Sequence, residues 1–156
     1  MIYYPDNLIC QLLNDSHVIA MVGASPKTNR QSHDVMRYLL SKGHIVYPIN
    51  PICVGDTIHG HKILASVTEV PEPIHMVDIF RRSELAGEAV DDAILVGARS
   101  VWLQLGVIDE AAAERAAEAG LTVIMDRCPV IEYRRLKKNR RERTLITIYG
   151  IKNCDT

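Results

Sequence analysis

Mainly apolar runs of five to seven residues alternate with amphipathic stretches between about residue 17 and residue 141. Short apolar runs of this kind are typical of strands that are covered on both faces of a parallel sheet. The runs that predict strands are residues 17–22, 45–49, 74–80, 100–104 and 121–126. A weaker run at residues 57–64 predicts a short strand at the sheet edge.

The stretches between these runs carry apolar residues at helical spacing and predict helices. They are residues 32–43, 81–97, 110–120 and 129–141. Gly43 and Gly120 end two of them, and Ser83 and Asp109 are candidate N-caps. This alternation predicts an α/β protein with a Rossmann-like, doubly wound, mostly parallel sheet of five or six strands and helices on both faces.

The chain length of 156 residues, with 47% hydrophobic residues, fits a single globular domain. We expect this domain to span residues 1–143. The remaining residues, 144–156, are expected to form a tail that is either an extra strand or disordered.

Composition argues against several classes of partner. The chain has 18 Lys and Arg against 19 Asp and Glu, so no general charge attracts it to nucleic acid or to a membrane. No signal peptide and no membrane span is predicted. Without either segment we expect a cytoplasmic protein. The cysteines are scattered without metal-ligand spacing, which predicts reduced thiols and no metal site. They are Cys10, Cys53, Cys128 and Cys154.

The loop after the first strand is the first candidate for chemistry, because ligands of doubly wound sheets bind beyond the carboxyl ends of the strands. In this loop Gly23 permits a tight turn. Backbone N–H groups at the start of the next helix can bind phosphate, and Lys27 and Arg30 add positive charge. Ser25 offers a hydroxyl for a phosphate oxygen or a helix cap. The alternative is an ordinary capped turn with two solvated cations.

The usual dinucleotide fingerprint, G-x-G-x-x-G with an acid after the second strand, is missing from this sequence. The first loop has one glycine, and the second strand is followed by Asn50 and Pro51. An acid at that place would bind the ribose hydroxyls of NAD and would repel a ribose phosphate. The pattern therefore argues against NAD and leaves coenzyme A and NADP as candidate cofactors.

The later strands are followed by residues that each allow two interpretations. Phe80 and Arg81 either contact an adenine or a pyrophosphate, or belong to the core and to a solvated helix start. Gln104 follows the fourth strand and is a candidate polar contact. Cys128 follows Arg127 at a predicted helix N-terminus, a setting that can activate a thiol. It is either a nucleophile or a cysteine beside a bound cofactor.

Four separated segments, each after a strand, resemble the bacterial CoA-binding domain family of small YccU-like proteins. They are VGASPKTNRQSHDVMRYLLSKGHIVYPINP, VDIFRRSE, WLQLG and DRCPVIEYRRL. These proteins look like the nucleotide-binding domain of the succinyl-CoA synthetase alpha subunit. The resemblance covers about residues 15–138 and implies a site for coenzyme A or acyl-CoA. The residues it places in this site are Gly23, Ala24, Ser25, Lys27, Arg30, Asn50, Pro51, Phe80 and Arg81, with Gln104 and Cys128 as weaker carry-overs.

The resemblance implies binding without catalysis, because the related ligases use a further domain and a partner subunit. We therefore expect a module for a small nucleotide cofactor that acts as a carrier, a sensor or a partner of acyl-CoA enzymes, and a homodimer stays open. The alternatives are an NADP-dependent reductase, a thiol enzyme using Cys128, and an interaction protein that has lost its ligand.

The tail TLITIYGIKNCDT resembles the opening strand and cysteine loop of arsenate-reductase-like proteins. We assign Cys154 no function.

Overall fold

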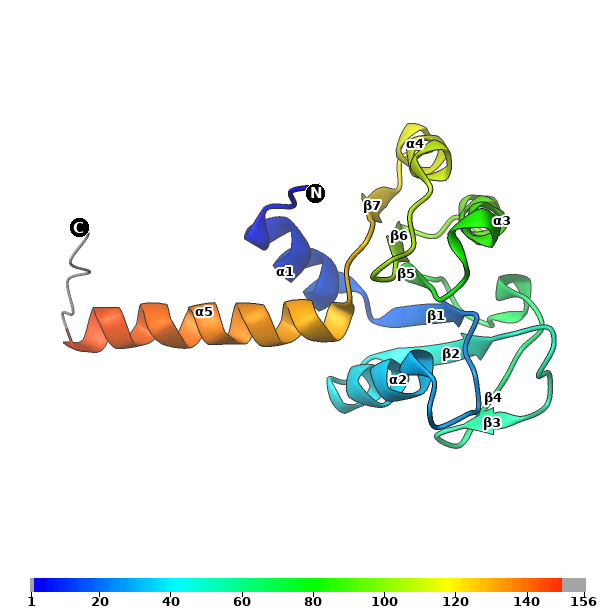
Figure 1. The fold of residues 1–156 in the computed structure, drawn as a ribbon, viewed down its shortest axis with the longest axis horizontal. Helices are drawn as coiled ribbons and strands as arrows, with labels where there is room; N and C mark the ends of the chain where they lie inside the picture. The colour runs from blue at the N-terminus through cyan, green and yellow to red at the C-terminus, as the bar shows by residue number, and fades with distance from the viewer. Residues whose placement is uncertain (1, 150–156) are drawn as a thin grey trace.

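The computed structural model describes residues 2–149, with side chains up to residue 145. Its centre is a sheet of parallel strands, shown in Figure 1. The strands are β1 (Val18–Val22), β2 (Ile45–Ile49), β5 (Met76–Ile79), β6 (Ser100–Leu103) and β7 (Thr122–Ile124). They lie in the order β2-β1-β5-β6-β7, so the predicted α/β class and doubly wound parallel sheet are confirmed, with five strands.

Helices cover both faces of this sheet (Figure 1). One face packs against α1 (Asp6–Asp15), α2 (Gln31–Ser41) and α5 (Pro129–Tyr149). The other face packs against α3 (Ser83–Leu95) and α4 (Glu110–Glu118). None of the helices within residues 2–149 is both long enough and apolar enough to cross a membrane.

Each face of the sheet has its own apolar cluster. On the face of α1, α2 and α5, the strand residues Met21 and Trp102 are buried against Leu13 and Met36 of the helices. Trp102 is therefore a core residue. On the opposite face the helices contribute small side chains, which let them approach the sheet closely. These side chains are Ala86, Ala89, Ala93, Ala112 and Ala116.

Two elements differ from the sequence prediction. The helix α1 was not predicted, although Ile9 and Leu13 lie one helical turn apart and both are buried against the sheet. Residues 57–64 do not form an edge strand of the main sheet. They form a separate hairpin of β3 (Thr57–Ile58) and β4 (His61–Lys62), and Leu64 alone bridges to β2 among the residues described.

The two predicted N-caps also have different outcomes. Asp109 caps α4, because its carboxylate accepts a hydrogen bond of 3.0 Å from the backbone N–H of Ala112. Ser83 is instead the first residue of α3 and makes no cap bond to its own helix. Its hydroxyl accepts a hydrogen bond of 3.0 Å from the backbone N–H of Ile108, which ties α3 to the loop after β6.

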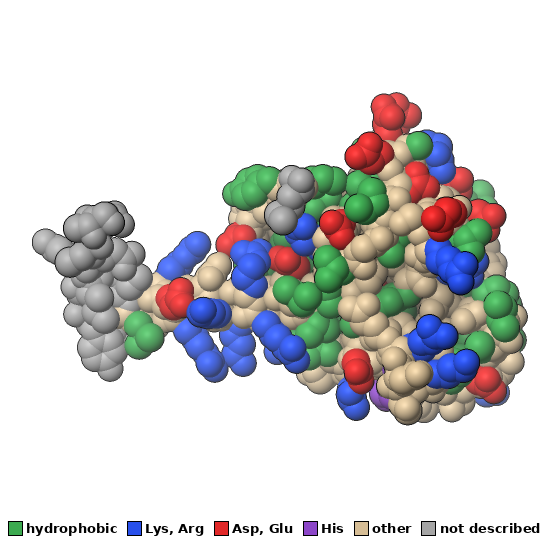
Figure 2. Space-filling view, viewed as in Figure 1, with side chains coloured by type: hydrophobic (Ala, Val, Ile, Leu, Met, Phe, Trp, Pro, Cys, Tyr) green, Lys and Arg blue, Asp and Glu red, His purple; other side chains and the backbone are tan. Residues whose placement is uncertain are grey.

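The last helix runs past the predicted end of the domain. Residues 144–149 continue α5, where the sequence suggested a strand or a disordered tail. Residues 150–156, including Cys154, lie outside the described part of the chain. The distal half of α5 extends from the body of the protein, and basic side chains gather along it (Figures 1 and 2). We assign this basic stretch no function.

Candidate functional site

The carboxyl ends of β1 and β5 form the switch point of the sheet. From β1 the chain crosses through α2 to β2 on one side, and it later returns to β5 on the other side of β1. The connections thus leave the two strands in opposite directions. A crevice opens at such a point in doubly wound sheets, and ligands bind there.

Gly23 lies directly at this crevice and only a glycine fits there. Its φ of +83° is a conformation that favours glycine, and its N–H donates a 2.9 Å hydrogen bond to the carbonyl of Ile49. A Cβ atom at this position would lie 2.4 Å from the carbonyl oxygen of Phe80. The first loop is therefore pressed against the backbone that follows β5.

The rest of the first loop is held by its own polar groups. The side-chain amide of Asn50 donates a 2.8 Å hydrogen bond to the carbonyl of Ala24, which links the ends of β1 and β2. The hydroxyl of Ser32 accepts a hydrogen bond from the N–H of Ser25, and the hydroxyl of Ser25 accepts one from the N–H of Lys27. These bonds fix the loop without using the Lys27 ammonium group.

The start of α2 combines free backbone donors with positive charge. The N-cap position of α2 is Arg30, and no side chain caps this helix. Lys27 and Arg30 are both exposed, and neither side chain has a hydrogen-bond or ion-pair partner among residues 2–145. An uncapped helix start with two unpaired cations favours an anion such as a phosphate.

A hollow of about 130 Å³ adjoins the switch point on the α3 side of the sheet. Pro51 and Arg81, both predicted site residues, line it. Its apolar wall is completed by side chains at the ends of β1 and β2 and on α3, and acids of α3 lie at its rim. These residues are Val22, Ile49, Leu85, Glu88 and Asp92. Apolar walls with acidic groups suit a base or a sugar better than a phosphate.

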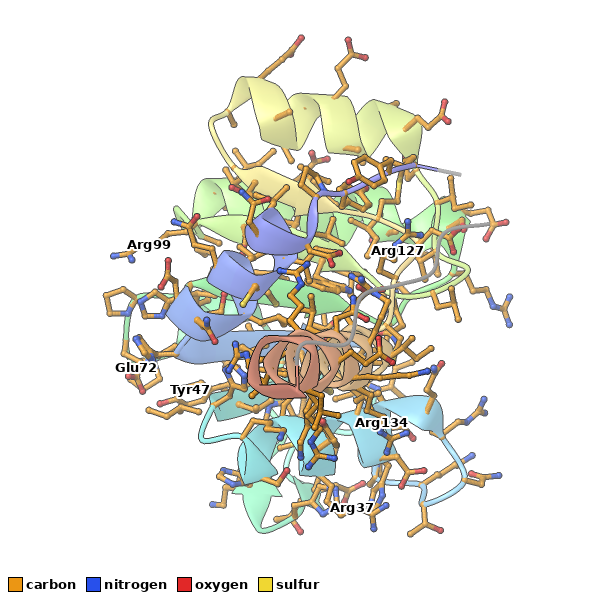
Figure 3. The ribbon with its side chains drawn as sticks, turned by 90° about the vertical axis from the view of Figure 1, so that its left-hand side faces the viewer. Arg37, Tyr47, Glu72, Arg99, Arg127 and Arg134 are labelled. Atoms are coloured by element: carbon orange, nitrogen blue, oxygen red, sulfur yellow. The ribbon has the colours of Figure 1, made fainter. Side chains whose placement is uncertain are left out.

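A larger groove of about 560 Å³ lies between α2 and α5 on the opposite side of the sheet. It is lined both by Gln31, the first residue of α2, and by Cys128, which precedes the first residue of α5. Arg37 and Arg134 also line it, and Figure 3 shows both on the same side of α5. The Arg134 guanidinium lies over the Tyr38 ring, 5.5 Å from its centroid, and so connects the two helices.

Two buried polar side chains lie between these helices and the sheet. Asp78 is in register with Trp102 on the neighbouring strand, and Gln104 follows Trp102 by two residues. Side chains alternate along a strand, so Asp78, Trp102 and Gln104 all face α5 and α2. Asp78 is 0% exposed and Gln104 is 2% exposed.

Neither the Asp78 carboxyl nor the Gln104 amide has a hydrogen-bond partner within the described chain. Burial raises the pKa of Asp78 well above its usual value, which favours the neutral carboxylic acid. Gln104 was predicted as a polar contact, whereas Asp78 was missed. The signal for Asp78 was a single acid inside the otherwise apolar run of β5, IHMVDIF.

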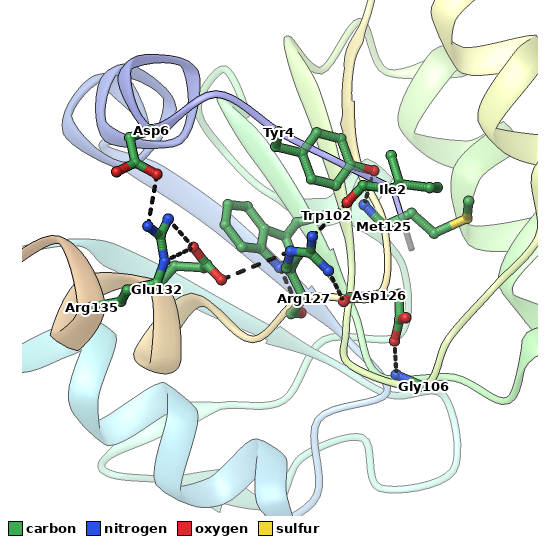
Figure 4. Close-up of polar contacts among 10 residues, drawn as sticks. All are labelled: Ile2, Tyr4, Asp6, Trp102, Gly106, Met125, Asp126, Arg127, Glu132 and Arg135. Carbon is green, nitrogen blue, oxygen red and sulfur yellow. Dashed lines mark hydrogen bonds and ion pairs between the residues drawn. The ribbon is translucent and has the colours of Figure 1, made fainter. Parts of the chain in front are cut away.

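The loop between β7 and α5, which carries Cys128, is fixed on several sides (Figure 4). The indole N–H of Trp102 donates a 2.9 Å hydrogen bond to the carbonyl of Arg127. The N–H of Met125 donates to the Tyr4 hydroxyl at 2.9 Å, and the Arg127 guanidinium faces the buried Glu132 at 3.9 Å. Cys128 itself is 4% exposed. The charge of Arg127 is therefore directed to Glu132 and the N-terminal segment.

The predicted site residues thus form two groups at one edge of the sheet. The first group surrounds the switch point: Gly23, Ala24, Ser25, Lys27, Arg30, Asn50, Pro51 and Arg81. The second group lies on the α5 side of the sheet: Phe80, Gln104 and Cys128. Phe80 is half-buried against the core cluster of that face, in line with the packing interpretation. Cys128 does not line the hollow beside α3.

These features define the class first: an α/β protein with a doubly wound sheet and its polar groups concentrated at the switch point. The chain belongs to the CoA binding domain family, since residues 17–134 match the sequence profile of that family. It is 36% identical over 120 residues to the uncharacterized protein YneT of Bacillus subtilis (strain 168). That match covers 77% of this chain and 87% of YneT.

Solved structures agree with this assignment. A hypothetical protein from Pyrococcus horikoshii OT3 is 40% identical and superposes with a TM-score of 0.81, covering 85% of this chain and 92% of that protein. A dinucleotide forming acetyl-coenzyme A synthetase from Ca. Korarchaeum cryptofilum is 27% identical with a TM-score of 0.61. The match covers 70% of this chain but 26% of the synthetase, so the shared unit is one part of a longer protein.

Proposed function

We propose that this protein binds coenzyme A or an acyl-CoA at the switch point and has no catalytic activity of its own. The observation that carries the proposal is the uncapped start of α2, where Lys27 and Arg30 stand unpaired beside the Gly23 loop. Membership of the CoA binding domain family supports coenzyme A as the ligand of this anion site.

The residues of the site fit the separate parts of such a ligand. Lys27, Arg30 and the N–H groups at the start of α2 hold phosphates. The hollow lined by Pro51 and Leu85 takes the adenine base, because its wall is apolar and the acids Glu88 and Asp92 can accept hydrogen bonds from the base. The ribose phosphate stays outside it, toward Lys27 and Arg30. Coenzyme A supplies a thiol or a thioester when bound, and the chain supplies the binding groups.

A cytoplasmic carrier, a sensor and a partner of acyl-CoA enzymes are the roles we propose for such a module. The acetyl-coenzyme A synthetase that shares its fold supports the last of these, because there the same unit is part of a longer enzyme. A homodimer is compatible with each role.

The test is thermal unfolding of the reduced protein with coenzyme A, acetyl-CoA, NADP and NAD in separate samples. A ligand at about 100 times its dissociation constant stabilises the native state by about 2.7 kcal/mol. We expect stabilisation by coenzyme A and acetyl-CoA. Stabilisation by NADP alone would overturn the choice of cofactor and favour a reductase, and no stabilisation by any of the four would favour an interaction protein.

Two matched double variants test whether Lys27 and Arg30 bind the phosphates of coenzyme A. The double change Lys27→Ala with Arg30→Ala removes two cations at the site, and we expect the affinity for coenzyme A to fall by roughly tenfold or more. Lys137→Ala with Lys138→Ala removes the same charge from exposed positions on α5 and is the control. Equal affinity of the two double variants would contradict the proposed site.

A further inference from the structure

Cys128 stands at the meeting point of two surface hollows. The groove between α2 and α5 reaches it from one side, and a second hollow of about 330 Å³, lined by Tyr4, Leu105 and Glu132, reaches it from the other. The groove starts at the first turn of α2, next to the phosphate site proposed above. A ligand held by its phosphates at Arg30 therefore has a continuous path along α2 to Cys128.

A buried amide on the same face of the sheet also points to a polar ligand, although it does not itself line the groove. The Gln104 amide is 2% exposed, and neither its oxygen nor its nitrogen has a partner within residues 2–145. It faces the same side of the sheet as Trp102, whose indole reaches the carbonyl of the residue before Cys128. Buried amides are normally paired, because leaving one unpaired costs about 1–3 kcal/mol. A ligand amide would satisfy both atoms of Gln104.

We propose that the groove between α2 and α5 takes the thiol-bearing arm of the cofactor, and that Cys128 forms a reversible mixed disulfide with that thiol. This inference rests on the proposed function, since it needs coenzyme A as the ligand. The arm of coenzyme A contains amide groups, which suit the unpaired Gln104 amide on the same face of the sheet, and it ends in the sulfur that meets Cys128. The groove volume of about 560 Å³ is within the range of small-molecule sites.

The chemical step is thiol–disulfide exchange with a disulfide of the cofactor. The Cys128 thiolate attacks one sulfur of the ligand disulfide, a new bond forms between Cys128 and that sulfur, and the ligand S–S bond breaks. The second half of the ligand leaves as a thiolate and takes up the proton that Cys128 gave up. One disulfide is exchanged for another, so no further oxidant is needed, and an added thiol reverses the step.

The experiment is to treat the full chain with coenzyme A disulfide and to locate the adduct by peptide mass mapping. We expect one coenzyme A per chain, on Cys128, removed by dithiothreitol. Cys128→Ser should lower the adduct yield by roughly tenfold or more, whereas Cys53→Ser, at a half-buried cysteine after β2, should leave it unchanged. The peptide map of the unmodified sequence decides the site even if the Cys128→Ser chain does not fold.

Glutathione disulfide serves as the matched reagent without a nucleotide. Cys10 and Cys53 are more exposed than Cys128, so a reagent that is not bound should modify them first. An adduct mainly on another cysteine, or modification of Cys128 as readily by glutathione disulfide as by coenzyme A disulfide, would overturn the inference.

Titration of the reduced protein with coenzyme A in dithiothreitol separates the proposed binding of coenzyme A from the proposed mixed disulfide on Cys128. Binding there without an adduct on Cys128 after treatment with coenzyme A disulfide overturns the mixed disulfide alone and leaves the proposed function. No binding there removes the proposed function, and the inference with it.

Discussion

The parallel strands begin at one end of the sheet, its amino edge, and finish at the other, its carboxyl edge. Both edges contain buried polar side chains, but they differ in how those side chains are paired. At the amino edge, the buried side chains of Ser16, His44 and Ser100 all make hydrogen bonds within the protein. Toward the carboxyl edge, Asp78 and Gln104 make none within the described chain. The amino edge is complete by itself, whereas the carboxyl edge has polar groups that the fold does not use.

His44 at the amino edge has a hydrogen-bond partner for each ring nitrogen. Its Nδ1 lies 2.5 Å from the carbonyl of Ser16, and its Nε2 lies 2.6 Å from the hydroxyl of Tyr133 on α5. On the other face of the sheet, the Tyr47 hydroxyl donates to the carboxylate of Glu72, and Figure 3 shows these two residues together on the side of the molecule away from Arg127. The bond from His44 to Tyr133 holds the last helix to the sheet, and both sets of bonds serve stability.

The contrast indicates which edge of the sheet serves binding and which serves stability. An unpaired buried polar group lowers stability unless a ligand, a buried water or a chemical role uses it. Variants at the amino edge should therefore change stability and leave binding unchanged. Variants toward the carboxyl edge should change binding without a loss of stability, except Gly23→Ala, whose added Cβ atom would clash with the backbone.

The largest effect is expected from Gly23→Ala, which would place a Cβ atom 2.4 Å from the Phe80 carbonyl oxygen. Both the clash and the positive φ act against it, so we expect a loss of about 3 kcal/mol or more in the free energy of unfolding. Gly43→Ala is the control, because Gly43 has a φ of +89° and an added Cβ there would meet no atom of the described chain within 4 Å. It should cost about 1 kcal/mol in urea unfolding. Equal losses would contradict the close approach at the switch point.

His44→Phe should be the next largest change. It removes the imidazole that forms the shorter hydrogen bond of the Tyr133 hydroxyl and the hydrogen bond to the Ser16 carbonyl. We expect a loss of about 2 kcal/mol in the free energy of unfolding. The affinity for coenzyme A should stay the same. A loss of affinity with unchanged stability would contradict the division between the edges.

The same histidine gives a pH dependence. Burial lowers the pKa of His44 in the folded protein below its usual value of 6.5, so below pH 6.5 the unfolded chain binds the proton first. Stability should therefore fall as the pH drops through this range, and less so in His44→Phe. Urea midpoints at several pH values measure the difference.

Gln104→Met tests the carboxyl edge with a side chain of similar shape and no unpaired polar atoms. We expect the affinity for coenzyme A to fall by roughly tenfold, while the free energy of unfolding of the free protein stays equal or rises, because a buried unpaired amide is removed. Calorimetric titration and thermal unfolding measure the two quantities. Lower stability with unchanged affinity would show that Gln104 serves the fold instead.

The smallest effect concerns Asp78. Because its pKa is raised by burial, the folded chain keeps a proton that the unfolded chain loses above about pH 3.8, and this group costs stability as the pH rises from there. Asp78→Asn removes the titration, so its stability relative to the parent should increase as the pH rises above about pH 4. The exposed Asp56→Asn should stay within about 0.5 kcal/mol at each pH. A constant difference at all pH values would contradict the raised pKa.

The sequence predicted the strands of the main sheet because each is a short apolar run between turn residues, as in the run that ends at Gly23. It did not predict α1, although the pairs Leu8/Leu12 and Ile9/Leu13 have helical spacing, because a ten-residue segment gives only a short periodic pattern. The hairpin at residues 57–62 resembled an edge strand in sequence. A two-residue strand has too few positions for a pattern to fix its partner.

Site residues were predictable from the sequence where the backbone geometry requires one particular residue type. Gly23 is such a case, because the loop must approach Phe80 more closely than a Cβ allows. The pairing of Asn50 with Ala24 and the unpaired state of Gln104 within the described chain depend on distances across the sheet, which one sequence does not contain. The separation of Cys128 from the hollow beside α3 likewise follows from which face each strand presents.

The most direct test of the contrast between the edges is a titration of the isotope-labelled, reduced protein with coenzyme A, followed by amide NMR. The contrast predicts that the backbone signals of residues 23–32 and the side-chain amide of Gln104 shift on binding, while the backbone signals of Ser16, His44 and Ser100 stay in place. Shifts at the amino edge without shifts at Gly23 and Gln104 would contradict it.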